Sequence, residues 1–145
     1  MDPEIRLPVS ARLPDAYVSD VSQRLVLYKR LASAPDEADL ERIRDEILDR
    51  YGPLPEETAN LLGVIRLKIL ARRLGVPTLD CVKGELVVAT GERSRVDPER
   101  LVNLLTQAGV GVHVTPDHRI LAPAPPGGAR ALLDSAAQLL LALGA

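Results

Sequence analysis

Two helices with well-marked ends occupy residues 13–55, and this pair constrains the fold of the chain more than any other feature of the sequence. Ser19 or Asp20 is placed to cap the first helix, predicted over about residues 20–33, and Asp36 to cap the second, predicted over about residues 36–51. A Gly-Pro pair ends the second helix, because glycine tolerates the backbone of a helix end and proline cannot continue a helix. The two helices are therefore expected to form a hairpin.

Apolar residues recur at helical spacing along both helices and predict which sides face the core. For the first helix the expected buried stripe, widened by Leu27 and Leu31, consists of Val21, Leu25, Tyr28 and Ala32. For the second helix it consists of Leu40, Ile43, Ile47 and Tyr51. Each helix thus has one expected buried side and one expected solvent-facing side.

The outward side of the second helix is acidic. Residues 36–50 hold seven Asp or Glu residues against three arginines, a formal charge of −4. At about 100° per residue, Arg42, Asp45 and Asp49 fall opposite the buried stripe, and Glu46 lies beside them. Such a face is either an ordinary solvated surface or a site for a basic partner, and the sequence leaves both interpretations open.

The rest of the chain predicts further helices and two β-hairpins. The helices are expected over about residues 55–74, 98–108 and 129–143, and the hairpins over about residues 78–90 and 110–122. The hairpins can pair into one small antiparallel sheet, with the intervening and final helices on one face and the first three helices as a separate layer. The expected fold class is α+β, with residues 1–18 as an extended linker and residues 19–145 as a single domain.

Composition limits the functions open to such a domain. A length of 145 residues with 46% apolar content suits one globular unit. A formal net charge of −2 disfavours a general phosphate-binding surface, and three tyrosines are the only aromatic residues, so platforms for stacking bases are scarce. A local contact with DNA is the alternative, made by Arg66, Lys68, Arg72 and Arg73 of the third helix with Arg24, Lys29 and Arg30 of the first. The same cations equally suit a surface role, balancing a helix dipole or pairing with the acidic helix.

No motif for catalysis or for a cofactor is present in the sequence. The glycines lack the following Lys and Ser or Thr of a phosphate-binding loop. Cys81, His113 and His118 lack the paired spacing of metal ligands, and no serine has the surroundings of a nucleophile. We therefore expect no catalytic residue, metal or cofactor, although a hydrolase whose site residues meet only in space stays a third possibility.

The cellular location follows from cysteine use and hydropathy. A single cysteine excludes an internal disulfide, and no signal segment stands at the amino terminus. Charged and polar residues interrupt the apolar stretch near the carboxyl end well short of the ~20 residues that a membrane helix requires. A cytoplasmic protein without a membrane partner is expected.

The helical hairpin also carries a resemblance. The residues that carry it are Pro14-Asp15, Tyr17, Arg24-Leu25, Tyr28-Lys29-Arg30-Leu31 and Asp49-Arg50-Tyr51-Gly52-Pro53. They resemble the carboxy-terminal domain of the bacterial transcription-repair coupling factor (Mfd) family, most firmly over residues 5–75. Members of that family are ATP-driven DNA translocases that remove stalled RNA polymerase and recruit the excision-repair protein UvrA. The motor is not part of this chain.

The resemblance implies a regulatory module without enzyme activity of its own. Such a module folds against the UvrA-binding domain of the same protein and masks that surface until the protein is engaged. Glu46 and Asp49 match the acidic positions of the family's closing motif, with Asp45 and Arg42 beside them. The resemblance thus implies an autoinhibitory protein interface on the second helix of a chain that is monomeric by itself.

Overall fold

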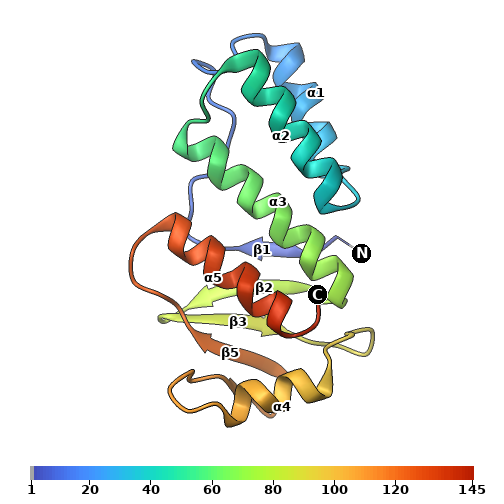
Figure 1. The fold of residues 1–145 in the computed structure, drawn as a ribbon, viewed down its shortest axis with the longest axis vertical. Coiled ribbons are helices and arrows are strands. Elements are labelled where there is room, and N and C mark those ends of the chain that lie inside the picture. The colour runs from blue at the N-terminus through green and yellow to red at the C-terminus, as the bar shows by residue number, and fades with distance from the viewer. Residues whose placement is uncertain (1) are drawn as a thin grey trace.

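The computed structural model describes residues 2–145 and contains five helices and five strands (Figure 1). The helices are α1 (Val21–Ala32), α2 (Glu37–Tyr51), α3 (Glu56–Leu74), α4 (Pro98–Thr106) and α5 (Ala129–Ala142). The strands are β1 (Glu4–Arg6), β2 (Thr78–Val82), β3 (Glu85–Ala89), β4 (His113–Val114) and β5 (Arg119–Pro123). No helix among the described residues has both the length and the apolar character needed to cross a lipid bilayer.

Side-chain caps begin three of the helices. The carboxylate of Asp20 accepts the backbone N–H of Gln23 at 3.0 Å, and that of Asp36 accepts the N–H of Asp39 at 2.8 Å. Asp97 caps α4 in the same way. Each bond satisfies one of the backbone donors that a helix leaves unpaired at its start. The short polar residues read from the sequence therefore fix where these helices begin.

The fold class is α+β, as expected, but the sheet is mixed. Its strand order is β1-β2-β3-β5-β4, in which the two predicted hairpins join through antiparallel pairing of β3 with β5. The fifth strand, β1, runs parallel to β2 and comes from the segment expected to be a linker. The Glu4 N–H donates to the Pro77 carbonyl at 2.9 Å, and the guanidinium of Arg6 binds both carboxylate oxygens of Asp80. Three residues are too few to show a strand periodicity in the sequence.

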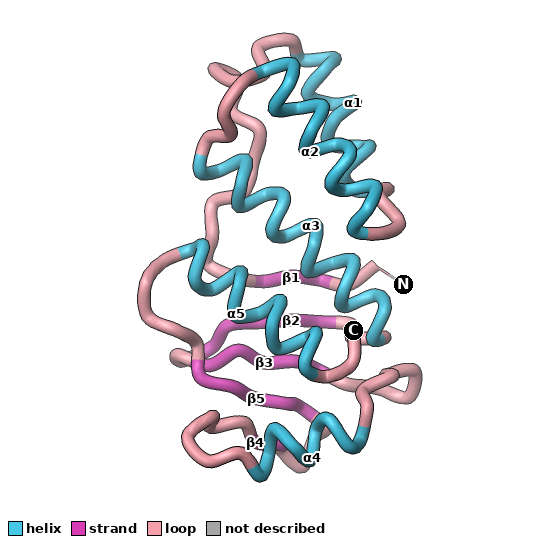
Figure 2. The backbone as a smooth tube through the Cα atoms, in the orientation of Figure 1, coloured by secondary structure: helices cyan, strands magenta, loops and turns pink. Residues whose placement is uncertain are grey.

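One face of the sheet is covered by α3 and α5, which lie side by side across it (Figure 2). The expectation that α4 and α5 would share this role is wrong. The carboxyl half of α3, with Leu67, Leu70 and Leu74, packs into the core beside Leu86 of the sheet and Leu140 of α5. Helix α4 lies near the β4 edge and has no buried residue. A nine-residue helix offers too little apolar surface to cover the sheet, whereas the 19 residues of α3 extend from the helical hairpin onto it.

A second hydrophobic core lies between α1, α2 and the amino half of α3, at the end of the molecule away from α4 (Figure 1). Leu27 and Leu31 of α1 meet Ile43 and Ile47 of α2 there. Residues at the start of α3, including Leu61, complete this core. Since α3 contributes to both cores, it joins the helical hairpin to the sheet.

The buried side of α1 differs from the expected one. Leu27 and Leu31 are buried, whereas Val21 and Leu25 are exposed. Apolar residues occur on nearly every side of this helix, so periodicity alone does not fix its rotation. Tertiary contacts decide it instead: the hydroxyl oxygen of Tyr28 accepts the N–H of Leu13 at 2.7 Å and holds that side of the helix against the preceding segment. The expected stripe of α2 is confirmed for Leu40, Ile43 and Ile47, which are buried, while Tyr51 is half-buried.

Candidate docking surface on the helical hairpin

The four residues proposed for a protein interface all lie on the exposed side of α2. Arg42, Asp45, Glu46 and Asp49 are exposed, while Ile43 and Ile47 between them point into the helical core. The helical spacing produces this arrangement, because residues three and four apart share a side. The surface is therefore accessible to another protein.

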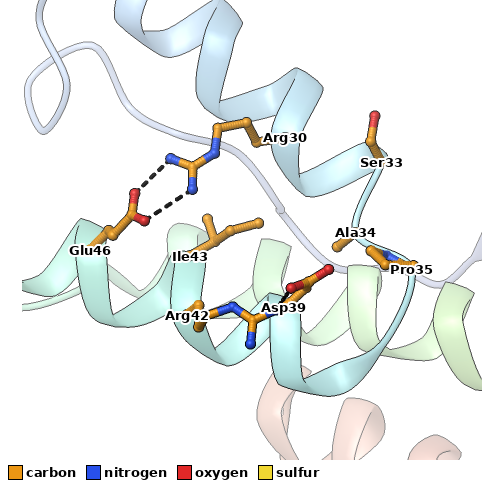
Figure 3. Close-up of a pocket in the computed structure, with 8 residues that line it drawn as sticks. All are labelled: Arg30, Ser33, Ala34, Pro35, Asp39, Arg42, Ile43 and Glu46. Carbon is orange, nitrogen blue, oxygen red and sulfur yellow. Dashed lines mark hydrogen bonds and ion pairs between the residues drawn. The ribbon is translucent and has the colours of Figure 1, made fainter.

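Glu46 is not free on this surface. The guanidinium of Arg30, on α1, donates to both carboxylate oxygens of Glu46, at 2.6 and 3.1 Å (Figure 3). These hydrogen bonds, with the positive charge behind them, hold the pKa of Glu46 below its usual range. The sequence analysis had named Arg30 as a candidate DNA contact. It missed the pair with Glu46 because a pattern within one helix does not show which side chains meet across a hairpin.

A shallow hollow of about 320 Å³ lies between the end of α1 and the first half of α2. Its lining consists of Arg30, Ser33, Ala34, Pro35, Asp39, Arg42, Ile43 and Glu46 (Figure 3). The Arg30–Glu46 pair closes one end, and an ion pair between Arg42 and Asp39 lies toward the other. An apolar floor at Ile43 with charges at the rim is typical of a protein contact rather than of a catalytic cleft.

Three other acids of α2 have no such partner. Glu41, Asp45 and Asp49 recur every four residues, are exposed, and form no ion pair with any residue between 2 and 145. Like charges at this spacing repel one another, so the stripe is slightly unfavourable for the isolated helix. These carboxylates are available to cations of a partner. A partner's cation would have to compete with Arg30 for Glu46.

The candidate DNA contacts on α3 are mostly engaged within the chain. Arg66 and Arg73 both form ion pairs with Glu37 at the start of α2, and the Lys68 ammonium lies 3.9 Å from Asp2. Arg72 is half-buried and has no ion pair among residues 2–145. Three of these four cations of α3 therefore pair with acids of the same chain, and Arg72 is the exception among residues 2–145.

The remaining cations of that candidate set are on α1. The guanidinium of Arg24 donates to the backbone carbonyl of Val18 at 2.8 Å, and Lys29 is exposed. Arg30 is held by Glu46. Of these three α1 cations, Arg24 and Arg30 thus bind groups of the same chain, and Lys29 is exposed to solvent.

The residues considered for metal binding lie on the sheet and its turns. Cys81 is half-buried on β2, and the Nε2 atom of His113 on β4 lies 3.8 Å from Glu85. His118 sits in the β4–β5 turn with a φ of 62°. Within residues 2–145 no group of three or more His, Cys, Asp or Glu side chains is placed to hold a metal ion.

The fold and the surface together define the class: a small α+β domain that presents a charged helical hairpin at one end of a mixed sheet. The sequence model of the TRCF domain family matches residues 7–101, which is well over half of the chain. The chain belongs to the TRCF domain family, and its resemblance to the carboxy-terminal domain of transcription-repair coupling factors is confirmed.

Relatives agree with this assignment. The transcription-repair-coupling factor of Myxococcus xanthus is 36% identical over 141 residues, which are 97% of this chain and 12% of that protein. The protein of that name from Escherichia coli strain K12 is 39% identical over 102 residues, which are 70% of this chain and 9% of that protein. The chain therefore spans about a tenth of the length of these relatives.

A solved structure supports the fold independently. The crystal structure of the C-terminal domain of transcription-repair coupling factor superposes with a TM-score of 0.85 and covers 98% of this chain and 91% of that one. The two chains are only 18% identical. The match therefore establishes a shared fold between two chains in which most residues differ.

Proposed function

We propose that this chain is a non-catalytic regulatory domain that docks on the UvrA-binding domain of its own parent protein and keeps it masked. The parent would act as a DNA translocase with RNA polymerase, UvrA and DNA in the bacterial cytoplasm, as its family membership suggests. No cofactor is needed for this role. Release of the domain would expose the masked surface when the parent is engaged.

The observation that carries this proposal is the unpaired acidic stripe on α2. Asp45 and Asp49 are exposed and form no ion pair within residues 2–145, while Glu46 beside them pairs with Arg30. A basic partner surface would relieve the repulsion along the stripe. Charge pairs at an interface rim contribute modestly and weaken with salt, which suits a contact that has to be reversible.

The test is a titration of the separately produced UvrA-binding domain with this chain by calorimetry. The Glu46→Lys/Asp49→Lys double variant should bind at least about tenfold more weakly than the wild type, because two attractive pairs become repulsive. A matched variant, Glu92→Lys/Glu99→Lys, makes the same net charge change at two exposed acids far along the chain. Equal affinity of the double variant and the wild type would contradict the proposal.

The same preparations address the DNA-binding alternative. The ion pairs of Arg66 and Arg73 with Glu37 favour protein docking, because DNA phosphates would have to compete with that carboxylate. A DNA titration at two salt concentrations should therefore show negligible binding. Tight binding that falls steeply with salt would favour the DNA function instead.

A further inference from the structure

A hollow of about 620 Å³ opens where the two hydrophobic cores meet. Leu54, which packs on the helical core, and Leu133 of the sheet core both line it. Helices α3 and α5 begin on the same side of the molecule, and their first halves form walls of the hollow (Figure 1). The outward acids of α2 do not line it. We call this space the junction hollow.

Small residues of α3 keep the junction hollow open. Ala59 and Gly63, one turn apart, both line it. A Cβ atom at Gly63 would lie 3.1 Å from the Cδ1 atom of Leu133, so α3 and α5 touch closely at that level. At Ala59, which is exposed, only a methyl group projects from α3. The space beside Ala59 is therefore left free.

Four charged side chains line the junction hollow without pairing. The cations are Arg44 of α2 and Arg130 of α5, and the acids are Glu56 of α3 and Asp134 of α5. None of the four forms an ion pair within residues 2–145. This includes Arg130 and Asp134, whose spacing of four residues brings opposite charges together on a helix. The hollow thus presents unpaired groups of both signs.

Asn60 adds a polar group to the junction hollow. It lines the hollow although it is only 6% exposed, and its amide nitrogen donates to the Ser10 carbonyl at 3.0 Å. Its side-chain oxygen accepts no hydrogen bond within residues 2–145. Every fully buried side-chain oxygen or nitrogen in that range has a partner, so the Asn60 oxygen is reached from the hollow. This oxygen is an acceptor for an N–H group of a ligand.

A second hollow, of about 530 Å³, continues the junction hollow along the start of α5. The two hollows share Glu56, Arg130 and Asp134. Gly128 precedes α5, and no side chain caps this helix. The first backbone N–H groups of α5 have no partner inside the helix, so they are donors for a ligand in the groove. The groove therefore offers both donors and acceptors, as an extended peptide backbone requires.

We propose that this groove binds an extended segment of a partner protein in which an acidic and a basic side chain stand two residues apart. Side chains two residues apart in an extended chain point to the same face, so both enter the groove. The carboxylate pairs with Arg44 and Arg130. The cation pairs with Glu56 and Asp134. A backbone N–H of the segment donates to the Asn60 oxygen, and its carbonyls accept from the start of α5.

Charge and size select this occupant. A nucleic acid strand or an anionic lipid brings only negative charge, which Glu56 and Asp134 oppose. A hollow of about 620 Å³ has the size of sites that enclose small ligands, so it admits a short segment and not a folded domain. The aliphatic stems of the two bound side chains cover Leu54 and Leu133. The groove goes beyond the masking function, since it uses none of the outward acids of α2.

The experiment titrates the isotope-labelled chain with the tripeptide acetyl-Glu-Ala-Lys-amide and follows the amide signals by NMR. We expect saturable shifts of the Gly127 and Gly128 backbone signals and of the Asn60 side-chain amide. Replacing the Glu of the peptide by Gln should weaken binding about threefold to tenfold, because the carboxylate contacts are lost. Replacing its Lys by Gln should weaken binding to a similar extent.

A pair of charge variants tests the contacts of the carboxylate. Arg44→Gln/Arg130→Gln should weaken binding of the tripeptide about tenfold or more. Lys29→Gln/Lys83→Gln removes the same net charge at two exposed cations that do not line the groove, and it should bind as the wild type does. Urea midpoints report whether each variant stays folded.

Ala59→Leu tests the space itself. Leucine is a good helix former, and its side chain fills the junction hollow beside α3, so peptide binding should be lost without a fall in the urea midpoint. Ala38→Leu, at an exposed position of α2 outside the groove, is the matched control and should bind as the wild type does.

Three results would overturn the inference. The first is the absence of shifts at Gly127, Gly128 and Asn60 with the tripeptide. The second is equal binding of the Gln-containing peptides, which would show that the charged groups are not recognised. The third is the same shifts with free glutamate or free lysine, which would make a small metabolite the ligand. None of these results bears on docking to the UvrA-binding domain, which the α2 variants test separately.

Discussion

Arg30 and Glu46 join α1 to α2 through two hydrogen bonds between their charged groups, at 2.6 and 3.1 Å. Asp49, three residues beyond Glu46 on the same side of α2, has no ion pair within residues 2–145. Glu46 and Asp49 are therefore not equivalent within the proposed interface. A partner's cation would meet Asp49 alone, but it would share Glu46 with Arg30.

Replacing Arg30 tests this inequivalence. Arg30→Met keeps the apolar stem of the side chain and frees Glu46, so docking on the UvrA-binding domain should tighten by about threefold to tenfold. Lys29→Met removes the same charge from the neighbouring exposed position without freeing an acid. Calorimetry of both variants should therefore show the larger gain for Arg30→Met. Weaker binding of Arg30→Met would mean that Arg30 serves the interface by positioning Glu46.

The same ion pair makes the stability of the hairpin depend on pH. The pKa of Glu46 is lowered in the folded chain, chiefly by its hydrogen bond to Arg30. A lowered pKa contributes stability that is fully present above the usual pKa of glutamate and is lost as the pH falls through the folded value. Urea unfolding should show wild type more stable than Arg30→Met at neutral pH, with the difference shrinking as the pH falls below the usual pKa of glutamate. If the stability difference persists undiminished in acid, the ionised Glu46–Arg30 pair is not its cause.

The sequence predicted most of the fold because local signals agree with it. Asp36 and Asp97 each cap the helix that their position indicated, and Asp20 rather than the alternative Ser19 caps α1. What the sequence could not predict depends on contacts between distant segments. Strand β1 exists only because Arg6 and its neighbours pair with β2, and α3 covers the sheet because its length lets it serve two cores.

The turn after α3 offers a test of close packing. Gly75 has a φ of 70°, and a side chain there would clash with the carbonyl oxygen of Arg93. Gly75→Ala should therefore lower the free energy of unfolding by about 2 kcal/mol or more. Gly84→Ala is the matched control, since Gly84 has a φ of 78° and open space around it, and should cost only about 1 kcal/mol. Equal losses in urea unfolding would show that backbone conformation alone matters at Gly75.

The candidate surface was predictable on α2 but not on α1. The apolar residues of α2 form a single stripe, so the sequence shows which side of the helix is buried and that the acids lie on the exposed side. In α1, Val21 and Leu25 compete with Leu27 and Leu31 for the core, and each pair has helical spacing. Packing against Ile43 and Ile47 resolves that competition in favour of Leu27 and Leu31, and Val21 and Leu25 stay exposed.

Helix α3 contributes to both hydrophobic cores, so the chain should unfold as one cooperative unit. All three tyrosines pack against the helical core, which makes tyrosine fluorescence a local probe, whereas far-UV circular dichroism reports every helix. Ile47→Ala in the helical core and Leu140→Ala in the sheet core each remove a fully buried side chain and should cost about 2–5 kcal/mol. Each variant should shift both signals to the same urea midpoint. If Leu140→Ala moves the dichroism transition and leaves the tyrosine transition in place, α3 does not couple the two cores.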